Sequence, residues 1–172
     1  PNKMLLPIFD GKTILEIIIS NLLIYFKSHQ IVLATTINPH DSKLEKIAKE
    51  SGINCFRGDE QDVLYRFIKA GEFYNSNNII RVCADNPLLQ ADYVKLLADE
   101  FLKKTQPCDY LSFAFPDGTP VIKSHLGLFA EATTLSTLRR AKQLTTDKFY
   151  HEHVTNYIYG NPKMFDVDFL SL

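Results

Sequence analysis

The stretch Asn78-Ile-Ile-Arg-Val-Cys-Ala-Asp-Asn-Pro87 decides the fold expected for this chain. Its first six residues form an apolar, β-branched run of the kind that fills a buried strand, and Asp85 follows where the strand ends. A strand that is buried on both faces is typical of a parallel sheet covered by helices. The polar residues after such a strand lie at the carboxyl edge of the sheet, where open α/β folds bind their ligands.

Short β-branched runs and segments of helical periodicity alternate on both sides of this stretch. The pattern predicts strands over 30–36, 53–56, 78–83, 109–113 and 164–169, and helices over 13–27, around 44–48, around 63–68, and over 91–104, 130–142 and 147–159. Thr13-Ile-Leu-Glu16 has the spacing of a capping box. We interpret 123–129 as an inserted or antiparallel strand. The alternation predicts an α/β fold with a mainly parallel, twisted sheet and helices on both faces.

The bulk composition fits one soluble globular domain spanning residues 1–172. The 19 Lys and Arg residues are balanced by 20 Asp and Glu residues, which argues against a broad basic surface for nucleic acid. The longest apolar run, over 14–26, is too short and too interrupted by polar residues to span a membrane. Cys55, Cys83 and Cys108 form no C-x-x-C pair, so we expect neither disulfides nor a zinc site, and a reducing cytoplasm is the expected compartment.

Asp85 is the first candidate for chemistry. A carboxylate at the carboxyl end of a strand can hold Mg²⁺, which neutralises the charge of a triphosphate. The alternative is that Asp85 only closes an Asx turn or caps a helix. The sequence contains neither G-x-G-x-x-G nor G-x-x-x-x-G-K-[ST], so a Rossmann dinucleotide site and a P-loop are not supported.

Several basic residues lie close to the predicted strand ends. Lys3 could meet a phosphate as a point charge. The alternative, which is the more common one for a lysine taken alone, is a surface residue. Arg57 follows one predicted strand, and Arg81 lies inside an apolar one, where it must face a cleft or find a carboxylate. Asp62 and Arg66 are four residues apart, so we expect them to pair on one helix face.

Two further groups of polar residues lie late in the chain. Strand alternation would place Lys123 and His125 on one face, where a basic pair suits a ligand that carries a carboxylate. The alternative is a solvated strand face. His151, Glu152 and His153 form a dense titratable cluster, but their spacing is not a metal motif and no metal is assigned to it.

Five segments carry a resemblance to a known family: 1–8, 34–36, 56–66, 81–88 and 152–158. Taken together they resemble the cytidylyltransferases. The branch that the chain resembles most is that of the spore-coat polysaccharide biosynthesis proteins, with the synthetases of CMP-ketodeoxyoctulosonate and CMP-acylneuraminate as more distant relatives. The resemblance implies a Rossmann-like, three-layer fold of the nucleotide-diphospho-sugar transferase type. It also implies transfer of CMP from CTP to a sugar acid, for surface polysaccharide biosynthesis in the cytoplasm.

The resemblance also assigns roles to individual residues. Asp85 matches the magnesium-binding aspartate of the family, and Lys3 matches a lysine that contacts the triphosphate, so both are expected to be catalytic. The remaining implied contacts are nucleotide binding by Thr35, Arg57 and Arg81, and sugar binding by Lys123, His125 and Glu152.

The chain departs from the family pattern at both ends. The family's first strand and its Arg- and Ser-rich loop precede the Pro-x-Lys segment, and a second metal-binding aspartate has no counterpart up to Leu172. We therefore expect residues 1–172 to lack an N-terminal strand and loop and a C-terminal segment. Two other functions stay open: a glycosyltransferase that uses a nucleotide sugar, and a non-catalytic nucleotide-binding module. The expected partners are CTP, a sugar acid and, from the family, a second copy in a homodimer, but no nucleic acid or membrane.

Overall fold

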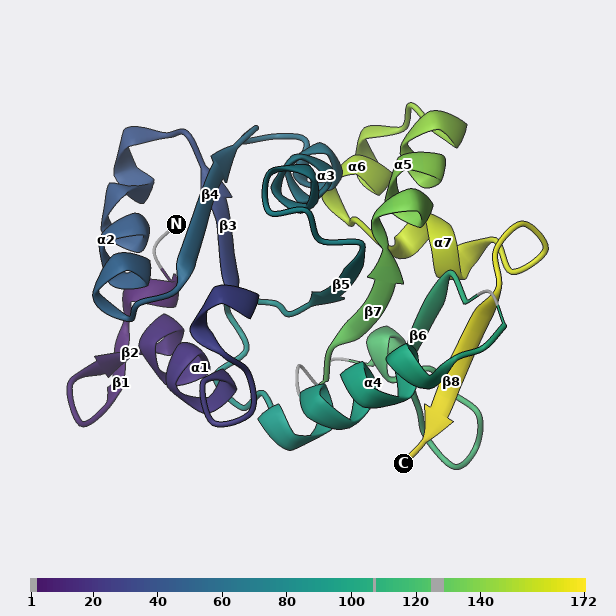
Figure 1. Ribbon diagram of the computed structural model, residues 1–172, viewed down its shortest axis with the longest axis horizontal. Coiled ribbons are helices and arrows are strands. Elements are labelled where there is room, and N and C mark those ends of the chain that lie inside the picture. Colours follow the sequence, from purple (N-terminus) through teal and green to yellow (C-terminus); the bar gives the residue numbers. More distant parts are fainter. Residues whose placement is uncertain (1–2, 107, 125–128) are drawn as a thin grey trace.

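The computed structural model describes residues 3–106, 108–124 and 129–172 (Figure 1). The strands are β1 (Pro7–Phe9), β2 (Lys12–Thr13), β3 (Val32–Thr36), β4 (Asn54–Gly58), β5 (Asn78–Arg81), β6 (Tyr110–Ala114), β7 (Glu131–Thr134) and β8 (Val167–Ser171). The α-helices are α1 (Ile14–Leu22), α2 (Ser42–Glu50), α3 (Val63–Phe73), α4 (Ala91–Lys103), α5 (Leu135–Leu144), α6 (Lys148–Glu152) and α7 (Asn156–Gly160). The short 3-10 helices are η1 (Lys3–Leu5), η2 (Ser28–Gln30), η3 (Pro39–Asp41) and η4 (Val121–Lys123).

Within the described part of the chain, the strands form three separate sheets. β1 and β2 make a small antiparallel hairpin, and β3 and β4 make a parallel pair in which Val32 faces Asn54. The third sheet has the order β5-β7-β6-β8. In it β7 runs antiparallel to both neighbours, whereas β6 and β8 are parallel. The predicted α/β class is confirmed, but the four-stranded sheet is mixed and the expected single sheet is divided.

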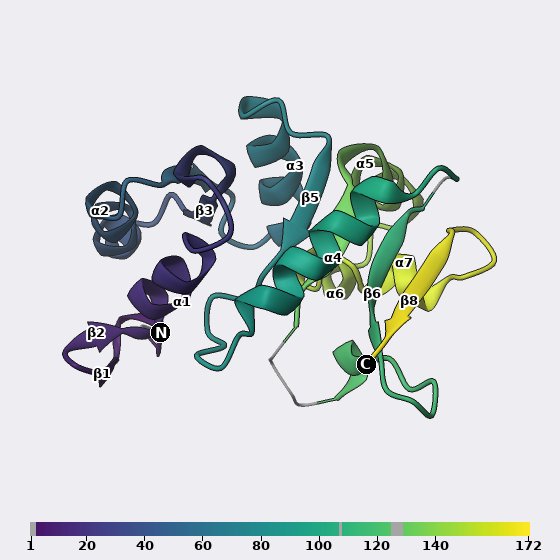
Figure 2. The same ribbon diagram turned by 60° about the horizontal axis from the view of Figure 1, so that its bottom comes forward.

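Helices cover both faces of the four-stranded sheet, as predicted. Figure 2 shows α4 crossing one face, with α5, α6 and α7 behind the strands. Successive side chains of β6 point to opposite faces of the sheet. Leu111 packs into the apolar cluster that contains α4, and its neighbour Tyr110 packs into the cluster that contains α3, α5 and α7. Both side chains are fully buried. No described helix has the length and apolar character needed to cross a membrane.

The N-terminus of α1 is built as its sequence predicts. The Thr13 hydroxyl accepts a hydrogen bond from the Glu16 backbone N–H at 3.3 Å, and the Glu16 carboxylate accepts one from the Thr13 N–H at 2.8 Å. This reciprocal pair satisfies two N–H groups that the helix leaves without intrahelical partners. The helix ends at Leu22, five residues earlier than expected.

The predictions near the C-terminus were less accurate. The expected helix over 130–142 is wrong in its first residues, because Glu131–Thr134 form β7 and the helix begins at Leu135. The expected helix over 147–159 is two short helices, α6 and α7, and the last strand begins at Val167. The segment expected to be a strand over 123–129 begins in η4, and 125–128 lie outside the described residues.

Candidate active site

The carboxyl ends of β3, β4 and β5 carry most of the residues that the sequence singled out. Thr35 lies near the end of β3, Arg57 near the end of β4, and Arg81 at the end of β5. Asp85 lies four residues beyond the end of β5 and is exposed. In an open α/β fold this edge is the position at which ligands bind, so the structure brings these predicted residues to the expected place.

Thr35 is held by a carboxylate on the following 3-10 helix. Its hydroxyl, in a side chain only 5% exposed, donates to Asp41 Oδ2 at 2.7 Å. The backbone N–H and the hydroxyl of Thr36 donate to the same oxygen, at 3.1 and 2.6 Å. Burial alone would raise the pKa of the Asp41 carboxyl, but these hydrogen bonds and the charge of Arg57 hold its pKa below the usual value. The Thr35 hydroxyl therefore uses its proton in the hydrogen bond to Asp41, and its oxygen can accept a hydrogen bond from a ligand.

The Arg57 guanidinium forms hydrogen bonds with other groups of the same chain. Its Nε donates to the Thr36 carbonyl at 2.9 Å, one Nη donates to the Asn38 carbonyl at 2.7 Å, and the other pairs with Glu45 at 2.9 Å. These contacts fix the turn between β3 and α2, close to Thr35. Nucleotide binding by Arg57 stays a prediction, and it would need at least one of these contacts to be shared or exchanged.

Arg66 belongs to the site, although the sequence did not assign it a ligand. It lines a cavity together with Thr35 and Asp41, and its Nη1 donates to the Asp59 carbonyl at 2.5 Å. Its buried Nε has no hydrogen-bond partner among the described residues. Burial lowers the pKa of the Arg66 guanidinium, against the nearby carboxylates that raise it. A buried donor without a partner costs stability, so Arg66 is suited to an acceptor that arrives with a ligand.

The expected pair between Asp62 and Arg66 is not formed in the described residues. Asp62 instead caps α3, accepting from the Tyr65 N–H at 2.8 Å, and its other oxygen pairs with Lys142. The physical reason is that the cap places the Asp62 carboxylate at the start of the helix, toward α5, whereas Arg66 turns toward the loop that precedes it. The sequence spacing alone did not distinguish these partners.

A buried charged network anchors the end of β5. Arg81 forms an ion pair with Glu131, which is 2% exposed and faces it across the antiparallel β5–β7 ladder. Tyr110 and Thr155 donate hydroxyl hydrogen bonds to the other Glu131 oxygen, at 2.9 and 2.7 Å. Burial alone would lower the pKa of Arg81, but the Glu131 carboxylate raises it above the usual value. Burial, reinforced by that carboxylate, raises the pKa of Tyr110.

A small cavity of about 210 Å³ opens beside this network. Burial raises the pKa of the Cys83 thiol; Arg81 opposes this rise, while the negative charges of Glu131 and Asp85 add to it. Asp85 itself lines neither described cavity, whereas its neighbour Asn86 lines the small one. No group of three or more metal-ligating side chains lies among the described residues. The lining residues are Arg81, Cys83, Asn86, Ser112, Val121, Ile122, Ser124, Phe129, Ala130 and Glu131.

The other predicted site residues are less well defined. Lys3 lies in η1, but its side chain is outside the part of the chain that is described. Lys123 ends η4 with an exposed side chain, between two residues that line the small cavity. His125 lies outside the described residues. Glu152 is exposed at the end of α6 and lines neither described cavity.

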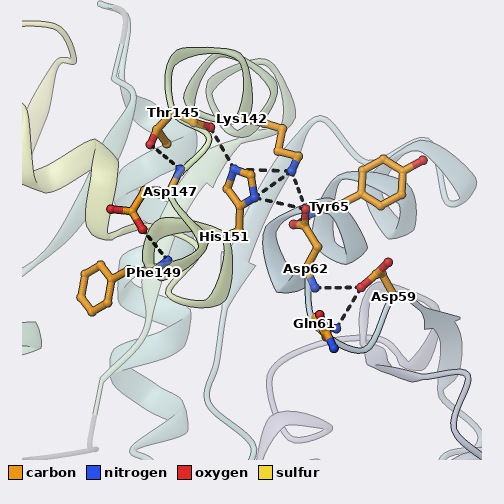
Figure 3. A network of polar contacts seen from close by, with 9 residues as sticks. All are labelled: Asp59, Gln61, Asp62, Tyr65, Lys142, Thr145, Asp147, Phe149 and His151. Atoms are coloured by element: carbon orange, nitrogen blue, oxygen red, sulfur yellow. Dashed lines mark hydrogen bonds and ion pairs between the residues drawn. The ribbon is translucent and has the colours of Figure 1, made fainter.

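His151, next to Glu152, lies in a structural network instead (Figure 3). Its Nδ1 is 3.0 Å from Lys142 Nζ and 3.3 Å from Asp62 Oδ2, and its Nε2 is 2.9 Å from the Thr145 carbonyl. Lys142 also pairs with Asp62. The network joins α6 to α3 and α5, so the histidine holds the C-terminal helices together.

Comparison with known proteins agrees with the family that the sequence resembles. A family model described as "Cytidylyltransferase" matches residues 1–171. An uncharacterized protein of Methanocaldococcus jannaschii is 36% identical over 169 residues, which cover 98% of this chain and 65% of the relative. The spore coat polysaccharide biosynthesis protein SpsF of Bacillus subtilis is 29% identical over 175 residues, covering 99% of this chain and 68% of the relative. The chain thus spans about two thirds of the length of these relatives.

Solved structures give the same fold. A cytidylyltransferase from Leptospira borgpetersenii is similar over the whole chain and 70% of its own length, with a TM-score of 0.89 and 28% identity. A CMP:2-keto-3-deoxy-manno-octonic acid synthetase complexed with CTP is similar over the whole chain and 83% of its own length, with a TM-score of 0.68. At 14% identity the second likeness concerns the fold alone. The predicted nucleotide-diphospho-sugar transferase-like fold is confirmed.

Proposed function

This chain belongs to the cytidylyltransferase family, and from that premise we propose that it transfers CMP from CTP to a sugar acid. In the reaction a hydroxyl oxygen of the acceptor attacks the α-phosphorus of CTP, pyrophosphate leaves, and the hydroxyl proton passes to solvent. The product is a CMP-sugar. Such a reaction needs two substrates held side by side, with their reacting atoms aligned.

The observation that carries the proposal is that two cavities meet at the end of β5. Arg81 and Cys83 line both the small cavity and the larger one that contains Thr35 and Arg66. Ligands in the two cavities would therefore meet immediately before Asp85, at the carboxyl edge of the sheet.

We assign the nucleotide to the side of Thr35 and Arg66. The Thr35 oxygen offers lone pairs to an amino or hydroxyl group of the nucleoside, and the free Nε of Arg66 offers a donor to an oxygen. A guanidinium whose pKa is lowered by burial still stays protonated at neutral pH, so Arg66 would also contribute positive charge.

We assign the acceptor to the small cavity. Its polar lining comes from Ser112, Asn86 and the Arg81–Glu131 pair, whose charges compensate one another. Positive charge for a sugar carboxylate would come from Lys123 beside the cavity, together with His125 as implied by the family. Recognition of the acid is thus proposed to depend on residues at the rim of the cavity.

Asp85 fits a magnesium ion of the kind this reaction uses. Mg²⁺ in phosphoryl-transfer sites is bound through one or two carboxylates together with substrate phosphates, so a single exposed carboxylate beside the meeting point is a suitable donor. The ion, when bound, would neutralise phosphate charge. Lys3 is the proposed second source of positive charge for the triphosphate.

The experiment that tests this function combines the full-length protein with each of the four nucleoside triphosphates, Mg²⁺ and a panel of sugar acids. We expect pyrophosphate release with CTP and one acid. Asp85→Asn should abolish release, whereas Glu50→Gln, at an exposed position on α2, should leave it unchanged. Binding of CTP without release by any acid would instead favour a non-catalytic module. Turnover of a nucleotide sugar would favour a glycosyltransferase.

A further inference from the structure

Arg81 lies in the wall between the two proposed substrate cavities. Among the described residues, Arg81 and Cys83 line both of them. The guanidinium carries a permanent positive charge, whereas burial raises the pKa of the Cys83 thiol and keeps it neutral. Of these two side chains, Arg81 is therefore the one that can attract a phosphate group from either cavity.

Glu131 holds Arg81 through a single carboxylate oxygen. Arg81 Nη1 donates to Glu131 Oε2. The other oxygen, Oε1, accepts hydrogen bonds from the Tyr110 hydroxyl at 2.9 Å and from the Thr155 hydroxyl at 2.7 Å. An arginine and a carboxylate often pair through two parallel hydrogen bonds, one to each oxygen. Because both hydroxyls already donate to Oε1, Glu131 pairs with one nitrogen of Arg81 instead.

The pairing through one oxygen leaves guanidinium donors for a ligand. A guanidinium has N–H groups on all of its nitrogens, arranged in a planar fork that matches the oxygens of a phosphate. The Arg81 side chain is 18% exposed, compared with 3% for Glu131, and it lines both cavities. The N–H groups that Glu131 does not bind can therefore donate to a substrate. A pair through two oxygens would direct one whole edge of the fork to the protein.

The two hydroxyls come from rigid parts of the fold. β7, which carries Glu131, lies between β5 and β6 in the sheet (Figure 1). On β6, the Tyr110 ring is fully buried and packs against the Tyr159 ring, with the ring centroids 5.5 Å apart. Thr155 is 1% exposed and immediately precedes α7, where its carbonyl accepts from the Ile158 N–H at 3.0 Å. Neither hydroxyl can leave Glu131 without disturbing the sheet or the helix.

Resting on the proposed CMP transfer, we propose that Arg81 donates hydrogen bonds to the α-phosphate of CTP during the reaction, and that Tyr110 and Thr155 are positioning residues. As the acceptor oxygen bonds to the α-phosphorus and the bond to pyrophosphate breaks, negative charge is spread over the oxygens of that phosphate. Fixed donors aimed at this charge lower the barrier. Tyr110 and Thr155 act through Glu131, because they occupy its Oε1 and so keep the fork of Arg81 turned toward the cavities. Arg81 keeps its own protons throughout.

Thr155→Val tests this role, because it removes the hydroxyl and keeps a side chain of similar shape. Glu131 Oε1 then loses one of its donors and can bind a second nitrogen of Arg81. We expect kcat for pyrophosphate release by the full-length protein to fall by roughly tenfold, while KM for CTP changes by less than about twofold. Thr155→Ser should restore kcat, and Tyr110→Phe should resemble Thr155→Val.

Thr133→Val is the matched control. Thr133 is also 1% exposed and lies on β7, but its hydroxyl donates to the Asp109 carbonyl at 2.7 Å rather than to Glu131. This variant should lose a similar amount of stability in urea denaturation while its kcat stays unchanged. Arg81→Lys should lower kcat by about a hundredfold, and in that background Thr155→Val should have no further effect.

Rotation about the Cζ–Nη bonds of Arg81, measured by NMR of the guanidinium without any substrate, tests the positioning separately. Pairing with both Glu131 oxygens should slow this rotation several-fold in Thr155→Val and leave it unchanged in Thr133→Val. Unchanged rotation in Thr155→Val would overturn the proposal, and so would an equal loss of kcat in the two variants.

Absence of pyrophosphate release from the wild-type protein would be a different result. It would contradict the proposed function, and with it the contact of Arg81 with a reacting phosphate. The rotation rates would still decide whether Thr155 positions Arg81 through Glu131, because they are measured without turnover.

Discussion

Arg81 on β5 and Glu131 on β7 face each other in antiparallel register and form an ion pair beside both cavities. The arginine side chain is 18% exposed and the glutamate side chain 3% exposed, so the glutamate is the buried partner. Tyr110 and Thr155 complete its hydrogen bonding. The position of the arginine head group, and with it the wall between the cavities, therefore depends on a carboxylate in the sheet.

Glu131→Gln should destabilise the protein strongly, because it leaves the Arg81 charge without compensation in a largely buried place. We expect a loss of about 3 kcal/mol in the free energy of unfolding, measured by urea denaturation. Asp168→Asn, in the more exposed pair with Lys104, should cost less than about 1 kcal/mol. Equal losses in the two variants would contradict the buried role of the pair.

Thr35→Val should change how Asp41 titrates. The folded protein holds the pKa of Asp41 below its usual value of 3.8, so this carboxylate contributes stability above that pH, and the contribution is lost as the pH falls through the lowered pKa. Without the Thr35 hydroxyl the pKa should rise, and the loss should begin at higher pH. Carboxyl carbon NMR measures the shift. Asp117, whose pKa is lowered by Thr119, should titrate unchanged.

Arg66→Lys should weaken CTP binding while the protein stays folded, because lysine has no Nε–H at that position and lacks the planar fork of arginine. We expect KM for CTP to rise by roughly tenfold with a smaller change in kcat, as measured by steady-state kinetics. Arg139→Lys is the matched control, since Arg139 pairs with Glu72 on the surface. An unchanged KM in Arg66→Lys would remove Arg66 from the nucleotide site.

Gly58→Ala tests the position of Arg66 without changing the arginine. A Cβ at this position would lie 3.0 Å from Arg66 Cγ and 2.8 Å from the Phe56 ring. The Phe56 ring must then shift and the Arg66 side chain must give way by a few tenths of an ångström, so we expect a rise in KM for CTP without any change in the charge of the site. Gly160→Ala, whose Cβ would meet no atom within 4 Å, is the control. Wild-type kinetics in Gly58→Ala would show that the site tolerates displacement of Arg66.

His151→Ala should lower stability but not activity. The histidine contacts Lys142, Asp62 and the Thr145 carbonyl, and its removal leaves these partly buried groups with fewer partners (Figure 3). We expect a loss of roughly 1–3 kcal/mol in the free energy of unfolding, with KM for both substrates unchanged. His153→Ala, at an exposed position, should cost less. A raised KM in His151→Ala would place the histidine in the site.

Much of the fold could be predicted because its signals are local. The capping box at Thr13 and the apolar runs of β3, β5 and β6 can each be recognised from residues that are adjacent in the sequence. The structure contains all of them. The start of β7 could not be recognised in this way. Glu131–Thr134 lie beside a strong helical pattern, and only pairing with β5 and β6, distant in sequence, makes them a strand.

The candidate site was predicted in its outline and less well in its contacts. Arg81 in an apolar strand indicated a buried partner, but Glu131 could not be named because β7 was not foreseen. Arg66 was assigned to Asp62 from helical spacing, whereas tertiary contacts direct Asp62 to Lys142. The signal that could have identified Arg66 was its position one turn into a helix that follows a strand end, facing the carboxyl edge of the sheet.

Transfer of CMP is tested most directly by following the α- and γ-phosphates of CTP separately. The full-length protein is incubated with Mg²⁺, the sugar acid that supports release, and CTP labelled with ³²P at either the α or the γ position. We expect the α label to move to the sugar product and the γ label to leave as pyrophosphate. Release of the γ label as inorganic phosphate, with the α label left in CDP, would contradict the transfer of CMP.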